Sequence, residues 1–218
     1  GICKNPIYLG LNFLAMQWIN AILAAIIASL LPIIVTIILW LFFNEKLNAL
    51  GMLGLLIGLL GLILIVNEAM PNNLNKLGVI FCLLGALALV VATIVVRNSD
   101  TNNIVMMIGL QMLVGSITLI PLSIAFESWE VDLTIRLIYS FLYTTIFPGL
   151  IATLIWFRLI YLIGPIKAAA FHFLNPFFGV GIAHLILAEK LLWPQLIGVL
   201  LVTLAILALQ LSKTKKAH

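Results

Sequence analysis

Long apolar runs separated by short polar breaks dominate this chain of 218 residues. Several runs reach about 20 residues, the length that an α-helix needs to cross the hydrocarbon core of a bilayer. The breaks fall where Gly, Pro, Asn and charged residues cluster. This pattern predicts eight helices, over residues 5–17, 20–43, 49–67, 76–97, 104–126, 135–162, 166–187 and 194–212.

The first two predicted helices are the hardest to separate, because Tyr8 to Phe43 is almost uninterrupted apolar sequence. A polar break occurs at Gln17-Trp18-Ile19-Asn20, and Trp favours the membrane interface. We therefore expect a tight turn at this break.

The composition narrows the class of protein further. Hydrophobic residues make up 64% of the chain and charged residues 8%, against about 45–50% and about 25% in soluble domains. A water-soluble fold is excluded, and the predicted class is an all-α, polytopic transmembrane helix bundle. Cys3 and Cys82 have no metal-ligand spacing, so the sequence predicts no metal and no cofactor.

The charges predict how the bundle lies in the membrane. With the amino end inside, the inner ends and loops hold eight of the eleven Lys and Arg residues, as the positive-inside rule expects. These are Lys4, Lys46, Arg97, Arg158, Lys167, Lys213, Lys215 and Lys216. Both termini are expected on the cytoplasmic side of a bacterial inner membrane, and nucleic acid is not an expected partner of the basic tail.

A sequence repeat with the pattern P-x12-E-K-L-x6-G occurs twice, at an offset of 144 residues. Its first copy runs from Pro32 to Gly54 and its second from Pro176 to Gly198. Upstream, Phe13, Ile22, Ala24 and Ala25 match Phe157, Ile166, Ala168 and Ala169. Each helix thus returns five helices later, and because five is odd the two copies face opposite ways. Inverted repeats of this kind are typical of secondary transporters.

These motifs resemble the EamA domain of the drug/metabolite transporter superfamily. The first copy carries A-A-I-I-A-S-L-L-P, F-F-N-E-K-L and G-L-L-I-G-L-L-G, and the second carries A-A-A-F-H-F-L-N-P and L-A-E-K-L. The resemblance implies a ten-helix fold of two inverted five-helix repeats, of which eight helices are present. Residues 1–70 would hold the last three helices of the first repeat, and residues 71–218 the complete second repeat with a basic tail.

Three departures from the family accompany this resemblance. Two helices are expected before Gly1, and the chain opens with Gly rather than Met. Many relatives have Glu where this chain has Asn175. The Gly-x6-Gly spacing of the third helix is not kept in the eighth.

Pro32 and Pro176 are the first candidates for a functional role. A proline inside a helix removes one backbone hydrogen bond, so both should kink their helices at bilayer depth. One interpretation is a packing kink that neighbouring helices satisfy. The other is a hinge, or an edge of the substrate cavity, which the symmetric placement favours.

Two titratable residues are candidates for contacts with a substrate. His172 is the deepest of the intramembrane candidates, with Asn175 nearby, and buried polar groups in a membrane are functional-site hypotheses by default; a histidine satisfied by a neighbouring carbonyl is the alternative. Arg158 lies about one turn from a helix end, where it would snorkel to the headgroups or bind an anion. The remaining cavity candidates are Asn12, Gln17, Ser29, Gln111, Tyr143 and Trp156.

No motif of covalent catalysis or ATP hydrolysis is present, so no catalytic residue and no enzyme activity are predicted. The predicted function is secondary transport of a small polar metabolite, an amino acid or a nucleotide-like solute, by alternating access. The alternative is a non-transporting accessory or lipid-headgroup-handling protein. The expected partners are a small-molecule substrate and membrane lipid, and a homodimer is left open.

Overall fold

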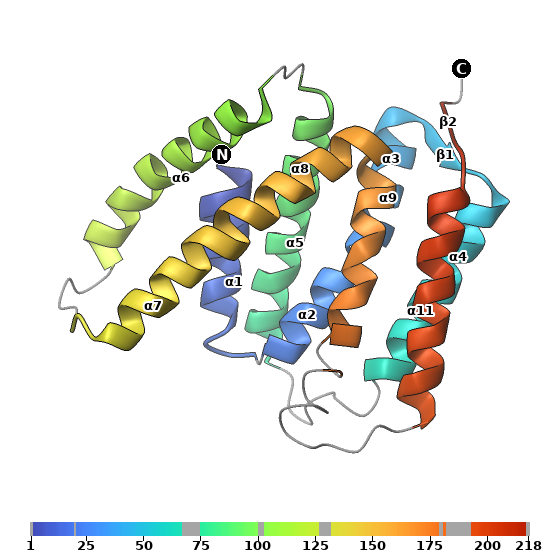
Figure 1. The fold of residues 1–218 in the computed structure, drawn as a ribbon, viewed down its shortest axis with the longest axis horizontal. Coiled ribbons are helices and arrows are strands. Elements are labelled where there is room, and N and C mark those ends of the chain that lie inside the picture. The colour runs from blue at the N-terminus through green and yellow to red at the C-terminus, as the bar shows by residue number, and fades with distance from the viewer. Residues whose placement is uncertain are drawn as a thin grey trace.

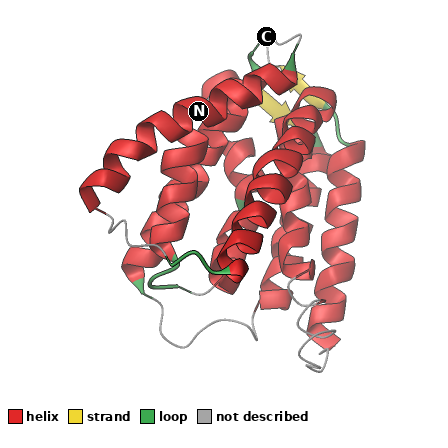
Figure 2. Cartoon of the chain, turned by 60° about the vertical axis from the view of Figure 1, so that its left-hand side comes forward, coloured by secondary structure: helices red, strands yellow, loops and turns green. Residues whose placement is uncertain are grey.

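The computed structural model of the chain describes residues 2–19, 21–66, 75–99, 103–126, 132–178, 181 and 193–216. Helices account for most of these residues (Figures 1 and 2). The elements are η1 (Cys3–Leu9), α1 (Gly10–Ala15), α2 (Ala21–Ser29), α3 (Leu31–Phe43), β1 (Glu45–Leu47), α4 (Ala49–Val66), α5 (Lys76–Arg97), α6 (Ile104–Phe126), α7 (Ile135–Thr144), η2 (Thr145–Ile151), α8 (Ala152–Ile163), α9 (Pro165–Ala170), η3 (Phe171–Phe173), α11 (Trp193–Leu211) and β2 (Thr214–Lys216). The predicted all-α bundle is confirmed, and α4, α5, α6 and α11 end within one residue of their predicted bounds.

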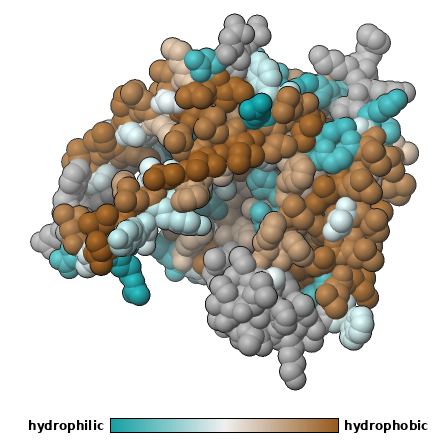
Figure 3. Space-filling model, in the orientation of Figure 1, coloured by the Kyte–Doolittle hydropathy of each residue, from teal (hydrophilic) through white to brown (hydrophobic). Residues whose placement is uncertain are grey.

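The helices have the character of membrane spans. Five segments of the described chain are long and apolar enough to cross a bilayer, among them Leu23–Phe43 and Lys76–Arg97. Large apolar side chains also cover much of the outer surface, which is brown over most of Figure 3. Such a surface is stable against lipid tails and unstable in water. The protein is therefore an integral membrane protein.

The predicted helix over residues 20–43 is interrupted near its middle. α2 ends at Ser29, and α3 begins at Leu31 with Pro32 in its first turn. The amide of Leu30 donates to the Ile27 carbonyl at 3.1 Å, an i to i−3 bond that tightens the junction. Because proline has no N–H and is tolerated in a first helical turn, the chain restarts a helix here instead of merely bending one.

The predicted helix over residues 166–187 is interrupted as well. α9 gives way to the 3-10 turn η3, and residues 174–178, which include the buried Pro176, are helical again. Shifted back by 144 residues, Phe171–Phe173 falls on residues 27–29, where α2 ends. The two copies of the repeat therefore break at matching positions. The second copy's E-K-L motif, Glu189-Lys190-Leu191, lies outside the described residues.

The helices predicted over residues 5–17 and 135–162 each contain a π-helical stretch with a proline inside it. η1 holds Pro6 and η2 holds Pro148. Shifted back by 144 residues, η2 falls on residues 1–7 and overlaps η1. Segments of π-helix are rare and often mark functional sites. Their matching places show that the repeat extends to backbone geometry.

Helices α4 and α11 pack side by side and antiparallel (Figure 1). Gly54 of α4 faces Ala205 of α11, and Gly61 faces Gly198. The offset of 144 residues converts Gly54 into Gly198 and Gly61 into Ala205, so each contact is the symmetry mate of the other. Two copies that meet about such an axis face opposite ways, as the inverted repeat predicts.

The strands β1 and β2 form an antiparallel pair beyond the ends of this helix pair. Glu45 pairs with Lys216 and Leu47 with Thr214. Since β1 precedes α4 and β2 follows α11, the pair joins the two repeats at one end of the bundle. The hydrophobic pattern did not predict this contact.

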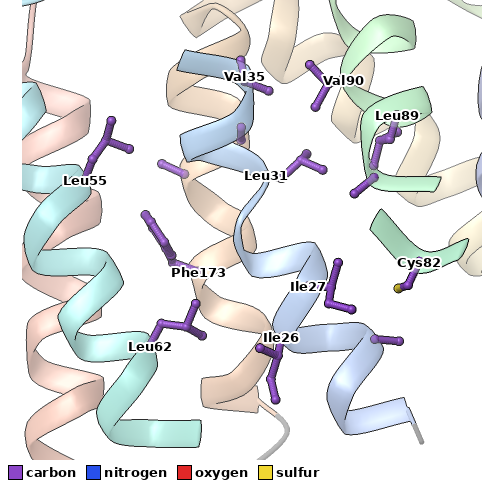
Figure 4. Close-up of a cluster of buried hydrophobic side chains, with 14 of the residues drawn as sticks. Ile26, Ile27, Leu31, Val35, Leu55, Leu62, Cys82, Leu89, Val90 and Phe173 are labelled. Atoms are coloured by element: carbon purple, nitrogen blue, oxygen red, sulfur yellow. The ribbon is translucent and has the colours of Figure 1, made fainter. Parts of the chain in front are cut away.

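The core lies where α2, α3, α4, α5 and η3 converge (Figure 4). Phe173 extends from η3 towards α4 and lies level with Leu55 and Leu62 in the close-up. A Cβ atom on Gly58 would lie 2.7 Å from the Phe173 ring, so only glycine leaves room for the ring here. The 3-10 turn therefore places a large side chain at the centre of the molecule.

Candidate functional site

The candidate site is built around the two interrupted helices, which approach each other in the core. α2 and α3 enter it from the first copy of the repeat, and α9 and η3 enter it from the second. Ser29 and Thr36 are buried beside the first interruption, but their hydroxyls donate to the carbonyls of Ala25 and Pro32 at 2.7 Å. Their own helices satisfy these donors, so neither hydroxyl is free to donate to a solute.

An aromatic pair lies beside the second interruption. The indole of Trp156, on α8, meets the imidazole of His172, on η3, edge to face with 4.7 Å between ring centres. Both residues are half-buried, and His172 also hydrogen-bonds with the backbone of Ala169. Asn175, one turn further along, is half-buried too. The sequence analysis named all three residues, and the fold brings Trp156 and His172 into contact.

A second contact joins the two π-helical segments of the repeat. The ammonium of Lys4, in η1, donates to the hydroxyl of Thr153 at the start of α8, at 2.5 Å. The same ammonium lies 5.2 Å from the centre of the Phe157 ring. A cation over a ring face is attracted by the π electrons. Lys4 was predicted to be an interface cation, and no sequence signal connects it with Thr153, 149 residues away.

An ion pair lies at the end of the bundle that carries β1 and β2. Arg97, the last residue of α5, pairs with Glu45, which is only 6% exposed, and its guanidinium also lies over the Phe43 ring. In α9, Lys167 donates to the Gln210 carbonyl at 2.6 Å, and Gln210 returns a hydrogen bond at 3.0 Å. These polar contacts tie α3, α5, α9 and α11 together at this end.

Other predicted cavity residues lie away from the aromatic pair. Asn12 donates to the Tyr8 carbonyl at 2.7 Å and accepts from the Cys82 thiol at 3.2 Å, so it faces α5. Gln17, Tyr143 and Arg158 are exposed. Gln111 is buried in α6, where its carbonyl accepts from Asn5.

The chemistry of the site is that of binding. Aromatic faces, an imidazole and an amide offer stacking and hydrogen bonds to a small solute. Among the described residues, no group of three His, Cys, Asp or Glu side chains could hold a metal ion. These features define an integral membrane helix bundle with a binding region between two inverted repeats.

Comparison with known proteins identifies the family. The model of the EamA-like transporter family matches residues 2–67 and 76–210, and the chain belongs to this family. Two curated relatives come from Bacillus subtilis (strain 168). The uncharacterized transporter YvbV is 24% identical over 214 residues, which cover 97% of this chain and 70% of YvbV. The uncharacterized transporter YoaV is 25% identical over 205 residues, which cover 89% of this chain and 68% of YoaV.

A solved crystal structure has the same fold. It superposes with a TM-score of 0.76 at 14% sequence identity, and the match covers 96% of this chain and 76% of the other. At this identity the likeness concerns the fold alone. It agrees with the family match, which identifies the protein as a transporter of the EamA-like family.

Proposed function

We propose that this protein is a secondary transporter that moves a small polar metabolite, such as an amino acid or a nucleotide-like solute, by alternating access. The observation that carries the proposal is the matching interruption of two helices, one in each copy of the repeat, at positions 144 residues apart. Interrupted helices near the midplane of inverted repeats hold the substrate in many secondary transporters. The proposal includes no catalytic step.

The proposed substrate cavity lies along these interruptions. Trp156 and His172 supply aromatic surface and Asn175 an amide, while Pro32 and Pro176 keep their helices from forming continuous hydrogen-bond ladders. We further propose that residues 1–70 and 71–218 are the units that rock against each other. The exchange of Gly54–Ala205 with Gly61–Gly198 under the offset supports this division.

We also propose that both ends of the described chain face the cytoplasm. Lys4 and Arg97 lie on segments that meet at one end of the bundle, and Lys216 pairs with Glu45 at this same end. Cations gather on the cytoplasmic side of membrane proteins. The bacterial origin of both curated relatives supports a cytoplasmic membrane.

The test is solute flux in proteoliposomes made with the purified protein. Radiolabelled amino acids, nucleosides and nucleotides are offered singly, with and without an excess of the unlabelled solute inside the vesicles. Alternating access predicts saturable uptake that unlabelled solute on the opposite side accelerates by exchange. Absence of saturable uptake for every class, with protein that is folded and inserted, would overturn the proposal and favour a non-transporting accessory protein.

A further inference from the structure

A cavity of about 410 Å³ lies between η1, α5, α6 and α8, apart from the aromatic pair of Trp156 and His172. Its volume falls within the range of small-molecule sites. Apolar side chains, including Phe157 and Met107, form most of its wall, and its polar residues include Lys4, Ser99 and Gln111. The cavity therefore combines an apolar body with a few polar groups, as ligand pockets do.

Gln111 supplies an unused donor to this cavity. The residue is only 8% exposed, and its side-chain Nε2 has no hydrogen-bond partner within the described part of the chain. Its backbone carbonyl, in contrast, accepts from the Asn5 amide at 3.2 Å. A buried N–H without an acceptor costs free energy. A ligand with an acceptor atom would remove this cost.

Lys4 supplies a positive charge to the same cavity. Its ammonium has three N–H donors, of which one is directed at the Thr153 hydroxyl at 2.5 Å. The only ion pair found among the described residues joins Arg97 to Glu45, so no described carboxylate neutralises Lys4. A charge in a largely apolar cavity favours a counter-ion strongly, because little water screens it.

The other polar groups near the cavity are satisfied. The Ser99 hydroxyl donates to the Val95 carbonyl at 2.8 Å, and the Thr153 hydroxyl donates to the Gly149 carbonyl at 2.5 Å. The groups left for a ligand are therefore N–H donors of Lys4 and Gln111. A ligand for them must present acceptor atoms and a negative charge.

We propose that this cavity binds a small organic monocarboxylate with an apolar body. The carboxylate oxygens accept from Lys4 Nζ and Gln111 Nε2, and the body packs against Phe157 and Met107. One cation matches one negative charge, whereas a phosphate dianion would remain half neutralised. The identification of this ligand as transported cargo rests on the proposed transport function, but the site itself is tested without transport.

The probes are benzoate and its uncharged counterpart benzamide, titrated into detergent-solubilised protein by calorimetry. Benzoate is expected to bind and benzamide to bind at least tenfold more weakly. Lys4→Met keeps most of the side-chain length, removes the charge and should weaken benzoate about tenfold or more. Lys4→Arg should restore binding, and Lys76→Met, which removes an exposed lysine at the start of α5, should leave it unchanged.

Gln111→Leu separates a binding role from a structural one. Removing an unpaired buried amide should raise the melting temperature while it weakens benzoate severalfold. A glutamine needed only for the fold would lower the melting temperature instead, and that result overturns its place in the site. Equal affinity for benzoate and benzamide, or unchanged benzoate affinity in a folded Lys4→Met protein, overturns the proposal.

Failure of this site and failure of transport have different signatures. Benzoate binding that depends on Lys4, in vesicles that show no saturable flux, sustains the site and refutes the transport function. Saturable flux in a protein that does not bind benzoate or aliphatic monocarboxylates refutes the site alone. Both measurements use the full chain of 218 residues.

Discussion

Gly61 and Gly198 approach each other so closely that neither could carry a side chain in place. A Cβ atom on Gly61 would lie 2.8 Å from the Gly198 carbonyl oxygen, and one on Gly198 would lie 2.7 Å from the Gly61 carbonyl oxygen. Close approach of backbones through small residues is the main way in which membrane helices pack tightly. The contact joins α4 to α11, and thus one copy of the repeat to the other.

Gly61→Ala and Gly198→Ala should each destabilise the protein, because the opposing atom is backbone and cannot rotate away. Overpacking of this kind costs about 1–3 kcal/mol, which the apparent melting temperature in detergent will report. Gly109→Ala is the matched control, since a Cβ atom added there would have no neighbour within 4 Å. In α6 this substitution should be neutral or stabilising by up to about 1 kcal/mol. Equal effects at the three glycines would contradict the close contact.

Glu45→Gln should destabilise the end of the bundle that holds β1 and β2. It leaves the Arg97 guanidinium without its counter-ion, and breaking a buried pair in this way costs about 3 kcal/mol. Replacing both residues by leucine should cost less than Glu45→Gln alone, because no charge is then left unpaired. Thermal unfolding of the three proteins, with Lys46→Leu as an exposed control in β1, measures this difference. A double variant less stable than Glu45→Gln would argue against the ion pair as the cause.

Trp156→Leu should weaken solute uptake without unfolding the protein. The edge-to-face contact with His172 contributes about 0.5–1.5 kcal/mol, which corresponds to an increase of up to about tenfold in the KM of uptake. The KM in proteoliposomes is the quantity to measure. Tyr139→Leu, which changes an exposed aromatic residue of α7, is the control and should leave the KM unchanged.

His172→Ala should change uptake or its dependence on pH if the imidazole lines the substrate cavity. Uptake measured between pH 5 and pH 8, where histidine titrates, tests this expectation. His172→Gln keeps a hydrogen-bonding side chain and should retain more uptake than His172→Ala. Unchanged uptake by His172→Ala at every pH would leave the histidine with a structural role only.

Pro32→Ala should lower transport while leaving stability unchanged or higher. Alanine supplies an N–H donor and allows α2 and α3 to merge into one helix, which removes the interruption. Pro121→Ala changes an exposed proline inside α6 and is the matched control for the helix effect. If the interruption is a hinge, the turnover rate falls in Pro32→Ala alone. A parallel fall in both variants would point to a general effect of proline removal.

The sequence predicted helices well because a span in hydrocarbon has no partner for its backbone except itself. Apolar length therefore located α5 and α6 to the residue. The matching prolines and the E-K-L motifs correctly indicated an inverted repeat. The π-helical turns at Pro6 and Pro148 left no trace in the apolar pattern, because a single wide turn changes backbone hydrogen bonds and not polarity.

The candidate site was predictable only in part. Rarity of polar groups at depth singled out His172, whereas its contact with Trp156 depends on how α8 and η3 pack. Lys4 and Arg97 were assigned to the membrane interface from their places at segment ends. Their partners, Thr153 and Glu45, are 149 and 52 residues away, and no local pattern encodes a contact at such a distance.

The pairing of β1 with β2 has a consequence for the making of the protein. Because α4 is synthesised well before α11, the glycines of α4 must enter the membrane without the helix that covers them in the finished bundle. Until α11 is inserted, this face is open to lipid, to chaperones and to membrane proteases. The short strand pair, formed only after α11 has crossed, then holds the two helices in place and marks the point at which assembly is complete.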